Sequence, residues 1–353
     1  MIPNMRKYFL GFLLIFLLAS AYQPALGANA AYTSRITPLL PKTTAENNKL
    51  GVVVRSLTTG QTIFEHNSKK QFIPASNEKI ITSVAALTLL EKDFRFKTEF
   101  FSGGGISKGV LHGGMYIKGY GDPTFSEGHL GYIVFELKKR GVKEIKGGIV
   151  VDESYFSPDR RAKGWKEEWK NDFYSPPIGA LSYNYNVIEV KVRGAGAGQK
   201  PTATIVPSGS NISIVNQAVT SMKKSTLHTK WQGDESLVLQ GSIRPKATIS
   251  LKIPVKKPTL LTGNVIKNKL QESGIKLEGN VTAGTVPRWA SRFYTHYSDP
   301  LSEVITEYNK NSVNIIGENL IKTLGAKFKG TPGTWENGSE VISTFLHQAG
   351  IET

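Results

Sequence analysis

Cysteine is absent from this sequence of 353 residues. The absence excludes a disulfide framework, thiolate metal sites and a cysteine nucleophile. Histidine is also scarce, and its six copies are never closer together than 17 residues. No helix can therefore carry the closely spaced histidine pair that is typical of a zinc site. We expect neither a metal ion nor another cofactor.

Long hydrophobic runs are absent after the first residues of the chain. Two basic residues precede an apolar run from Phe9 to Ala19, and small residues at Ala25 and Gly27 suit a cleavage site. This pattern predicts a secretory signal peptide over residues 1–27. The alternative, an uncleaved anchor, needs about 20 apolar residues, and this run is shorter. Export without disulfides favours a bacterial periplasm or cell envelope.

Acidic residues are few, with 28 against 44 basic residues and a formal net charge of +16. Such a surface attracts polyanions, among them nucleic acid, anionic lipid and anionic wall polymers. An exported protein rarely meets nucleic acid, so we expect none as a partner. A peripheral contact with an anionic wall or membrane surface stays open. Ordinary solvated faces explain the scattered lysines at least as well.

The first part of the mature chain combines strands with one apolar helix. Residues 50–67 read as two strands joined by a Thr-Thr-Gly turn. Ile80, Val84 and Leu87 then recur at helical spacing, which predicts a mostly buried helix over 77–91. Ser76 lies at the start of this helix, where serine is also a favoured cap.

Short β-branched runs separated by Gly, Pro and Asn fill residues 99–286. They predict mostly strand, and RGAGAGQ within them predicts a hairpin tip. We expect helices in and after this region near 127–140, 259–273, 298–310, 313–325 and 335–349. The order predicts an α+β fold in which a β-rich module interrupts one domain.

Ser76 and Lys79 stand three residues apart at the start of the predicted helix. This spacing puts them on one face. The field of the helix N-terminus favours a serine alkoxide, while burial favours a neutral lysine that can act as a base. A cap serine beside a surface lysine is the plain alternative. Ser221 and Lys224 repeat the spacing in a polar loop, where no buried helix follows.

A second element, Ser312-Val313-Asn314, lies between two predicted helices. Serine nucleophiles that act without histidine combine Ser-x-x-Lys with Ser-x-Asn and Lys-Thr-Gly in penicillin-binding proteins and class A β-lactamases. Another Ser-x-Asn, Ser182-Tyr183-Asn184, lies inside the strand-rich region, where we expect a structural turn.

The 236 residues between Ser76 and Ser312 hold a long β-rich insert. An insert at this place resembles the class C low-molecular-mass penicillin-binding proteins, which are D-alanyl-D-alanine carboxypeptidases and endopeptidases. The likeness covers about residues 40–350. The stretches that carry it are PASNEK, IKGYGDPTF, VVDESYFS, GALSYNYN and KNSVN.

The resemblance implies a penicillin-recognising transpeptidase fold that acts on peptidoglycan stem peptides and is inhibited by β-lactams. Its catalytic domain would span residues 28–98 and 287–353, and residues 99–286 would form an inserted module of two subdomains. By the same resemblance, Ser76 is the acylated nucleophile and Lys79 takes its proton. Ser312 relays a proton to the leaving group, and Asn314 holds Lys79 and the substrate amide.

The sequence departs from this family in its third element. No Lys-Thr-Gly or Lys-Ser-Gly follows Asn314, and Lys322-Thr323-Leu324-Gly325 is spaced differently within a predicted helix. We expect a chain truncated before this motif, with part of its central sheet missing and its activity weak. Side chains made to pack on that sheet would stay exposed, namely Ile80, Val84, Leu87, Ile316 and Leu320. The alternative is a non-catalytic peptidoglycan-binding relic.

Overall fold

A computed structural model describes residues 26–351, so the predicted signal peptide lies outside the described residues except for its last two positions. The chain forms two compact units, Met1–Ala75 and Ser76–Thr353. Within the described range, no helix is both long and apolar enough to cross a membrane.

Unit 1 contains the predicted hairpin. Strands β1 (Val52–Arg55) and β2 (Thr62–His66) pair in antiparallel fashion, which confirms the two strands. The Asn67 side chain donates to the carbonyl oxygens of Asn47 and Leu50 and so ties the end of β2 to the segment before β1. That segment holds helix α2 (Leu26–Ile36), the 3-10 turn η1 (Thr37–Leu39) and the short helix α3 (Thr44–Asn47).

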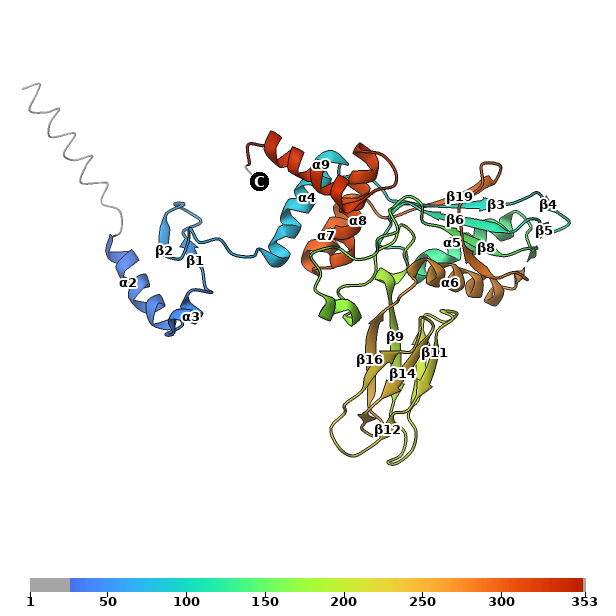
Figure 1. The fold of residues 1–353 in the computed structure, drawn as a ribbon, viewed down its shortest axis with the longest axis horizontal. Helices are drawn as coiled ribbons and strands as arrows, with labels where there is room; N and C mark the ends of the chain where they lie inside the picture. The colour runs from blue at the N-terminus through green and yellow to red at the C-terminus, as the bar shows by residue number, and fades with distance from the viewer. Residues whose placement is uncertain (1–25, 352–353) are drawn as a thin grey trace, which may run out of the picture. The chain divides into compact units, whose positions relative to one another are not determined.

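Unit 2 is built on a five-stranded sheet with the order β18-β8-β6-β3-β19 (Figure 1). Its strands are β3 (Lys97–Ser102), β6 (Met115–Gly119), β8 (Ile149–Asp152), β18 (Val281–Ala283) and β19 (Ser291–Tyr297). The first three in spatial order are parallel, and β3 is antiparallel to both of its neighbours. Because β3 begins before residue 99 and pairs with β19 after 287, the predicted boundaries at 98/99 and 286/287 cut through this sheet.

Two helices pack against strands of this five-stranded sheet. They are α5 (Glu127–Lys139) and α6 (Pro258–Glu272), both near their predicted places. Gly263 of α6 lets the helix approach, since a Cβ there would lie 2.5 Å from Val281 and 2.8 Å from Val151. A small four-stranded sheet has the order β17-β7-β5-β4. Its strands are β4 (Ile106–Ser107), β5 (Val110–Leu111), β7 (Glu144–Ile145) and β17 (Lys276–Leu277).

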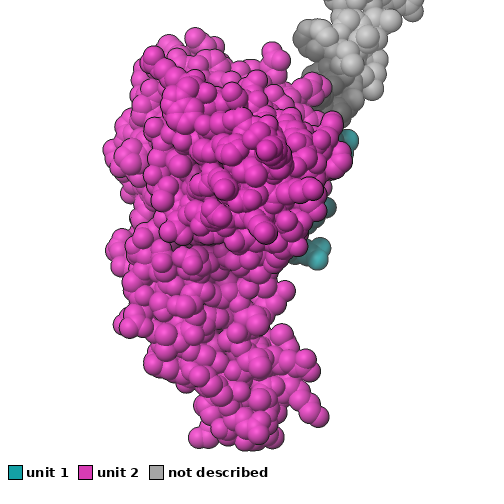
Figure 2. All heavy atoms as spheres, turned by 90° about the vertical axis from the view of Figure 1, so that its right-hand side faces the viewer, with its two compact units in different colours: residues 1–75 teal, residues 76–353 magenta. Residues whose placement is uncertain are grey.

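A β-sandwich module projects from the rest of unit 2 (Figure 1), and unit 2 is narrower at this end (Figure 2). One sheet has the order β10-β9-β16 and the other β11-β14-β13. The strands are β9 (Val187–Arg193), β10 (Thr202–Val206), β11 (Ser213–Asn216), β13 (His228–Trp231), β14 (Ser236–Gln240) and β16 (Thr248–Pro254), with β12 (Val219–Thr220) and β15 (Ser242–Ile243) as a small third pair. The predicted hairpin tip RGAGAGQ indeed joins β9 to β10, which pair in antiparallel fashion.

Four helices form the remaining part of unit 2: α4 (Glu78–Leu89), α7 (Leu301–Lys310), α8 (Asn314–Phe328) and α9 (Trp335–Gln348). The first three share a core that includes Ala86, Leu301, Ile316 and Leu320. All four helices lie within a few residues of their predicted bounds. Together with the sheets they confirm the predicted α+β fold.

The prediction that α4 is mostly buried is wrong for Ile80 and Val84. Ile80 is 61% exposed and Val84 is 48% exposed, and the buried residues of the helix are small ones such as Ala85 and Ala86. The other prediction, that side chains made to pack on a sheet would stay exposed, agrees with the structure for Ile80 and Val84. It is wrong for Ile316 and Leu320, which are fully buried. The packing of α8 on α4 and α7 buries that face of α8 without a sheet.

Candidate active site

Ser76 lies in a 3-10 turn, η2 (Ala75–Asn77), directly before α4. Its hydroxyl oxygen accepts a hydrogen bond from Lys79 Nζ at 3.3 Å and another from Ser312 Oγ at 3.1 Å. The N-cap of α4 is Asn77, whose side chain makes no capping bond. The hydroxyl of Ser76 is thus engaged by a lysine and a second serine, and the alternative of a plain cap serine does not describe it.

Ser312 and Asn314 enter the site from the short connection between α7 and α8. Ser312 has a φ of 54°, in the left-handed region that non-glycine residues rarely adopt. Asn314 opens α8, and its Oδ1 accepts a hydrogen bond from Lys79 Nζ at 2.6 Å. Its Nδ2 donates to the carbonyl oxygen of Tyr174 at 2.8 Å. These two bonds fix the orientation of the amide toward Lys79.

Lys79 is half-buried between the two motifs and stacks 5.6 Å from the ring centre of Tyr308. Burial lowers the pKa of Lys79 below its usual value, whereas the negative charges of Glu318 and Glu78 act to raise it. A lowered lysine pKa increases the fraction of neutral amine that can accept a proton. Lys79 therefore has the environment that a general base beside Ser76 needs.

Glu318, which our sequence analysis missed, lies close enough to Lys79 for its charge to influence the pKa of that lysine. It follows Asn314 by four residues in α8, on the same side of the helix. Burial raises the pKa of its carboxyl group to about 7, and Trp335 Nε1 donates a hydrogen bond to Glu318 Oε2 at 2.7 Å. The i,i+4 spacing from Asn314 was the available signal. The spacing alone does not show that Glu318 is buried, because this burial comes from the packing of α9 on α8.

A cavity of about 730 Å³ opens at these residues. Its lining includes Ser76, Ser312 and Asn314, together with the aromatic side chains of Tyr174 and Tyr185. Its volume is that of a typical small-ligand site. The cavity exposes the Ser76 hydroxyl to a bound molecule, which a nucleophile requires.

The other motifs from the sequence lie elsewhere. Ser182 is buried and donates to the carbonyl oxygen of Gly179, so this Ser-x-Asn forms a structural turn, although its Asn184 does line the cavity. Ser221 follows β12 in the sandwich module, and its hydroxyl accepts from the backbone of Lys223.

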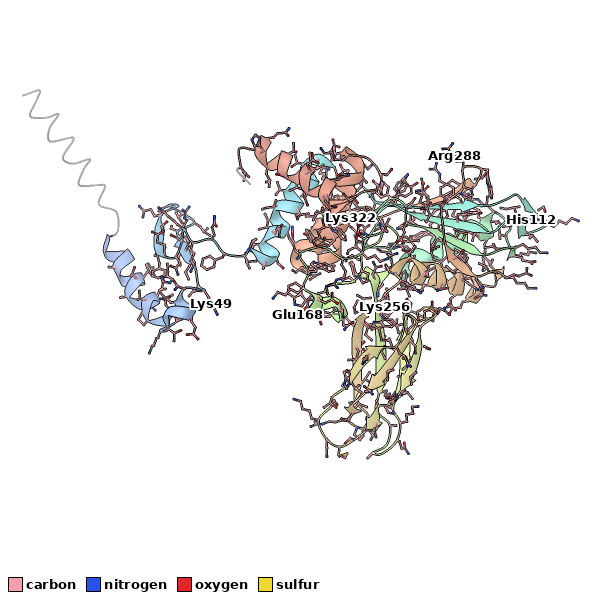
Figure 3. All side chains as sticks on the ribbon, viewed as in Figure 1. Lys49, His112, Glu168, Lys256, Arg288 and Lys322 are labelled. Carbon is pink, nitrogen blue, oxygen red and sulfur yellow. The ribbon has the colours of Figure 1, made fainter. Side chains whose placement is uncertain are left out.

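Lys322 lies inside α8, as expected, and is buried. Figure 3 labels it among the helices of unit 2. Its ammonium group donates to the carbonyl oxygens of Ser157 and Asp159 and lies 4.0 Å from the ring centre of Trp335. Burial lowers the pKa of Lys322 to about 8. These bonds tie α8 to the loop after β8, so Lys322 does not act as the third motif.

With this geometry defined, the chain can be compared with known proteins. The sequence model of the D-Ala-D-Ala carboxypeptidase 3 (S13) family matches residues 33–353. The chain belongs to this family. The resemblance to the class C low-molecular-mass penicillin-binding proteins is therefore confirmed.

Curated relatives of this S13 family chain are named as carboxypeptidases. A D-alanyl-D-alanine carboxypeptidase of Actinomadura sp. (strain R39) is 28% identical over 331 residues, which is 90% of this chain and 61% of that protein. D-alanyl-D-alanine carboxypeptidase DacB of Haemophilus influenzae is 27% identical over 95% of this chain and 70% of that protein. The chain thus spans about two thirds of the length of these relatives.

A solved structure supports the fold of the S13 family chain. The crystal structure of penicillin binding protein 4 (dacB) from Haemophilus influenzae has a TM-score of 0.77, with 24% sequence identity over 91% of this chain and 71% of that one. The predicted fold, an α+β chain of the penicillin-binding protein type, is in agreement with this similarity.

Proposed function

We propose that the chain is an exported serine-type D-alanyl-D-alanine carboxypeptidase or endopeptidase that acts on peptidoglycan stem peptides through an acyl-enzyme. The observation that carries the proposal is the double contact on Ser76 Oγ, from Lys79 Nζ at 3.3 Å and Ser312 Oγ at 3.1 Å. The curated relatives named as D-alanyl-D-alanine carboxypeptidases support the substrate class.

The acylation step uses each of the four residues. Neutral Lys79 takes the hydroxyl proton as Ser76 Oγ attacks the carbonyl carbon of the scissile peptide bond. Ser312, in contact with Ser76, gives its hydroxyl proton to the departing amine as the C–N bond breaks, and Lys79 returns the proton it took from Ser76 to Ser312 Oγ. Asn314 holds Lys79 and offers its amide to the substrate. Water then attacks the ester carbonyl, which releases the acid and restores the Ser76 hydroxyl.

β-Lactams are expected inhibitors because their strained amide acylates the same hydroxyl. The Haemophilus penicillin binding protein 4 has been crystallised in complex with a β-lactam, which supports this expectation.

The second candidate is a non-catalytic peptidoglycan-binding protein. The net charge of +16 favours it, because such a charge suits a peripheral contact with an anionic wall or membrane surface. The two candidates differ in one property, covalent reaction at Ser76.

Labelling with fluorescent penicillin tests the proposal. We expect residues 28–353 to be labelled, Ser76→Ala to lose the label, and the matched control Ser221→Ala to keep it. Equal labelling of Ser76→Ala and the unchanged chain would overturn the assignment of the nucleophile. A folded chain that takes no label at all would support the non-catalytic candidate.

A further inference from the structure

A second cavity of about 830 Å³ lies next to the candidate active site. It shares two lining residues, Phe173 and Lys252, with the cavity at Ser76. Its other walls come from the sandwich module and from the turn η3 (Glu167–Asn171). Figure 3 labels Glu168 of η3 and Lys256, which follows β16 at the end of the sandwich nearest the helices. A ligand that extends beyond Ser76 can therefore continue into this second cavity.

The second cavity runs along the edges of two strands. Consecutive residues line it, Thr229–Trp231 of β13 and Ser250–Pro254 of β16. Successive side chains of a strand point to opposite faces, so a cavity that touches all of them follows the strand edge. β13 ends the order β11-β14-β13, and β16 ends the order β10-β9-β16. Edge strands present unpaired backbone N–H and C=O groups, which an added peptide strand can pair with.

The charged residues that line the second cavity all have the same sign. Its lining includes five basic residues and no acidic one; the basic residues are Arg161, Lys170, Lys230, Lys252 and Lys256. Glu167 pairs with Lys170 at 2.6 Å and Asp234 pairs with Lys256 at 3.5 Å. Lys230 and Lys252 form no ion pair with any described residue. Because all the charged residues that line the cavity are basic, the lining favours a ligand that carries carboxylates.

Aromatic rings complete the lining. Lys252 Nζ lies 5.7 Å from the ring centre of Phe173, and Lys256 Nζ lies 5.6 Å from that of Trp231. The rings hold these two ammonium groups by cation–π contact and offer apolar surface to the body of a ligand. The cavity thus combines backbone edges, cations and apolar walls, which suits a peptide better than a glycan.

We propose that the second cavity binds an extended, carboxylate-bearing peptide arm of the substrate, as an added strand along the β13 and β16 edges. The inference rests on the proposed function, since it takes the reacting end of the same peptide to be at Ser76. It favours long or cross-linked stem peptides over short ones as substrates. Lys230 and Arg161 are the side chains that would select their carboxylates.

Binding to the full chain with Ser76→Ala tests this proposal without requiring turnover. The probe is a fluorescein-labelled peptide with glutamate at alternate positions, followed by fluorescence anisotropy. We expect Lys230→Glu combined with Arg161→Glu to raise the Kd about tenfold, the size of two lost surface charge contacts. Lys223→Glu combined with Lys224→Glu makes the same charge change outside the cavity and should leave the Kd unchanged. Thermal unfolding of each variant monitors its fold.

Three further probes distinguish a carboxylate-bearing peptide strand from other ligands of the second cavity. A peptide with glutamine in place of glutamate should bind at least about tenfold more weakly, and N-methylation of alternate amides should abolish the ladder bonds and weaken binding as well. An anionic polysaccharide should not compete. Equal binding of the glutamine peptide, equal competition by the polysaccharide, or an unchanged Kd in the cavity variant would overturn the proposal. If the chain binds the peptide but is not labelled by penicillin, the peptide site in the second cavity is supported and the proposed acyl-enzyme is contradicted.

Discussion

Lys79 Nζ lies 2.6 Å from Asn314 Oδ1, although the two residues are 235 positions apart in the chain. This is the shortest contact that the ammonium group makes to the three other proposed catalytic side chains, since its bond to Ser76 Oγ measures 3.3 Å. Asn314 in turn donates to the backbone of Tyr174. The amide therefore links the base of one motif to the wall of the cavity, and the first of our predictions tests this link.

Asn314→Ala should slow acylation by penicillin about 10- to 100-fold. A hydrogen bond to a charged group contributes about 1.5–3 kcal/mol, and the change removes the Asn314 contact that orients Lys79. Asn311→Ala is the matched control, because Asn311 lines the same cavity but its side chain bonds to Glu307 and to no other described residue. The measurement is the second-order rate of fluorescent penicillin labelling. Similar rates for the two variants would remove Asn314 from the proposed machinery.

Glu318→Gln should shift the pH dependence of acylation to lower pH. The negative charge of Glu318 acts to raise the pKa of Lys79, so its removal lets burial lower that pKa further. The base acts in its neutral form, and the rate should then rise at a lower pH than in the unchanged chain, by roughly one unit or less. Glu340→Gln, which removes an exposed carboxylate paired with Lys329, is the control. A profile that stays in place would show that Glu318 does not influence the base.

The same carboxyl group should make the stability of the chain fall as pH rises. Its pKa is raised from 4.5 to about 7 in the folded state, where it is buried. The folded state then holds the proton more tightly than the unfolded state, so stability is lost as pH increases from 4.5 through 7. The loss is roughly 3 kcal/mol when complete. Urea unfolding at pH 5 and pH 8 should show Glu318→Gln more stable than the unchanged chain at the higher pH only. A difference of equal size at both values would contradict the titration of Glu318.

Ile316→Ala should destabilise the chain by roughly 2–5 kcal/mol, the cost of a cavity at a fully buried position. Ile80→Ala removes the same atoms from a side chain that is 61% exposed, and should change stability by about 0.5 kcal/mol or less. Urea unfolding of residues 28–353 measures both. Equal losses would contradict the exposure of Ile80 and indicate that this side chain is covered in solution.

The sequence alone determined those features of this protein that depend on residues close together in the chain. Helical spacing of apolar residues gave the helices of unit 2 within a few positions, and the three-residue step from Ser76 to Lys79 put the two side chains together, since one helical turn fixes that distance. The β-branched runs gave the strands. The long β-rich stretch between the two motifs indicated the family that the comparison then confirmed.

Tertiary structure decided what depends on contacts between distant segments. The packing of α7 and α8 on α4 brings Ser312 to Ser76 across 236 residues, buries Ile316, and leaves Ile80 exposed. Strand pairing joins β3 to β19 across the predicted domain boundaries at 98/99 and 286/287. The burial of Glu318 and the second cavity along the edges of β13 and β16 likewise cannot be predicted from the neighbouring sequence. Periodicity reports which face of an element is apolar, but only the packed structure determines what covers that face.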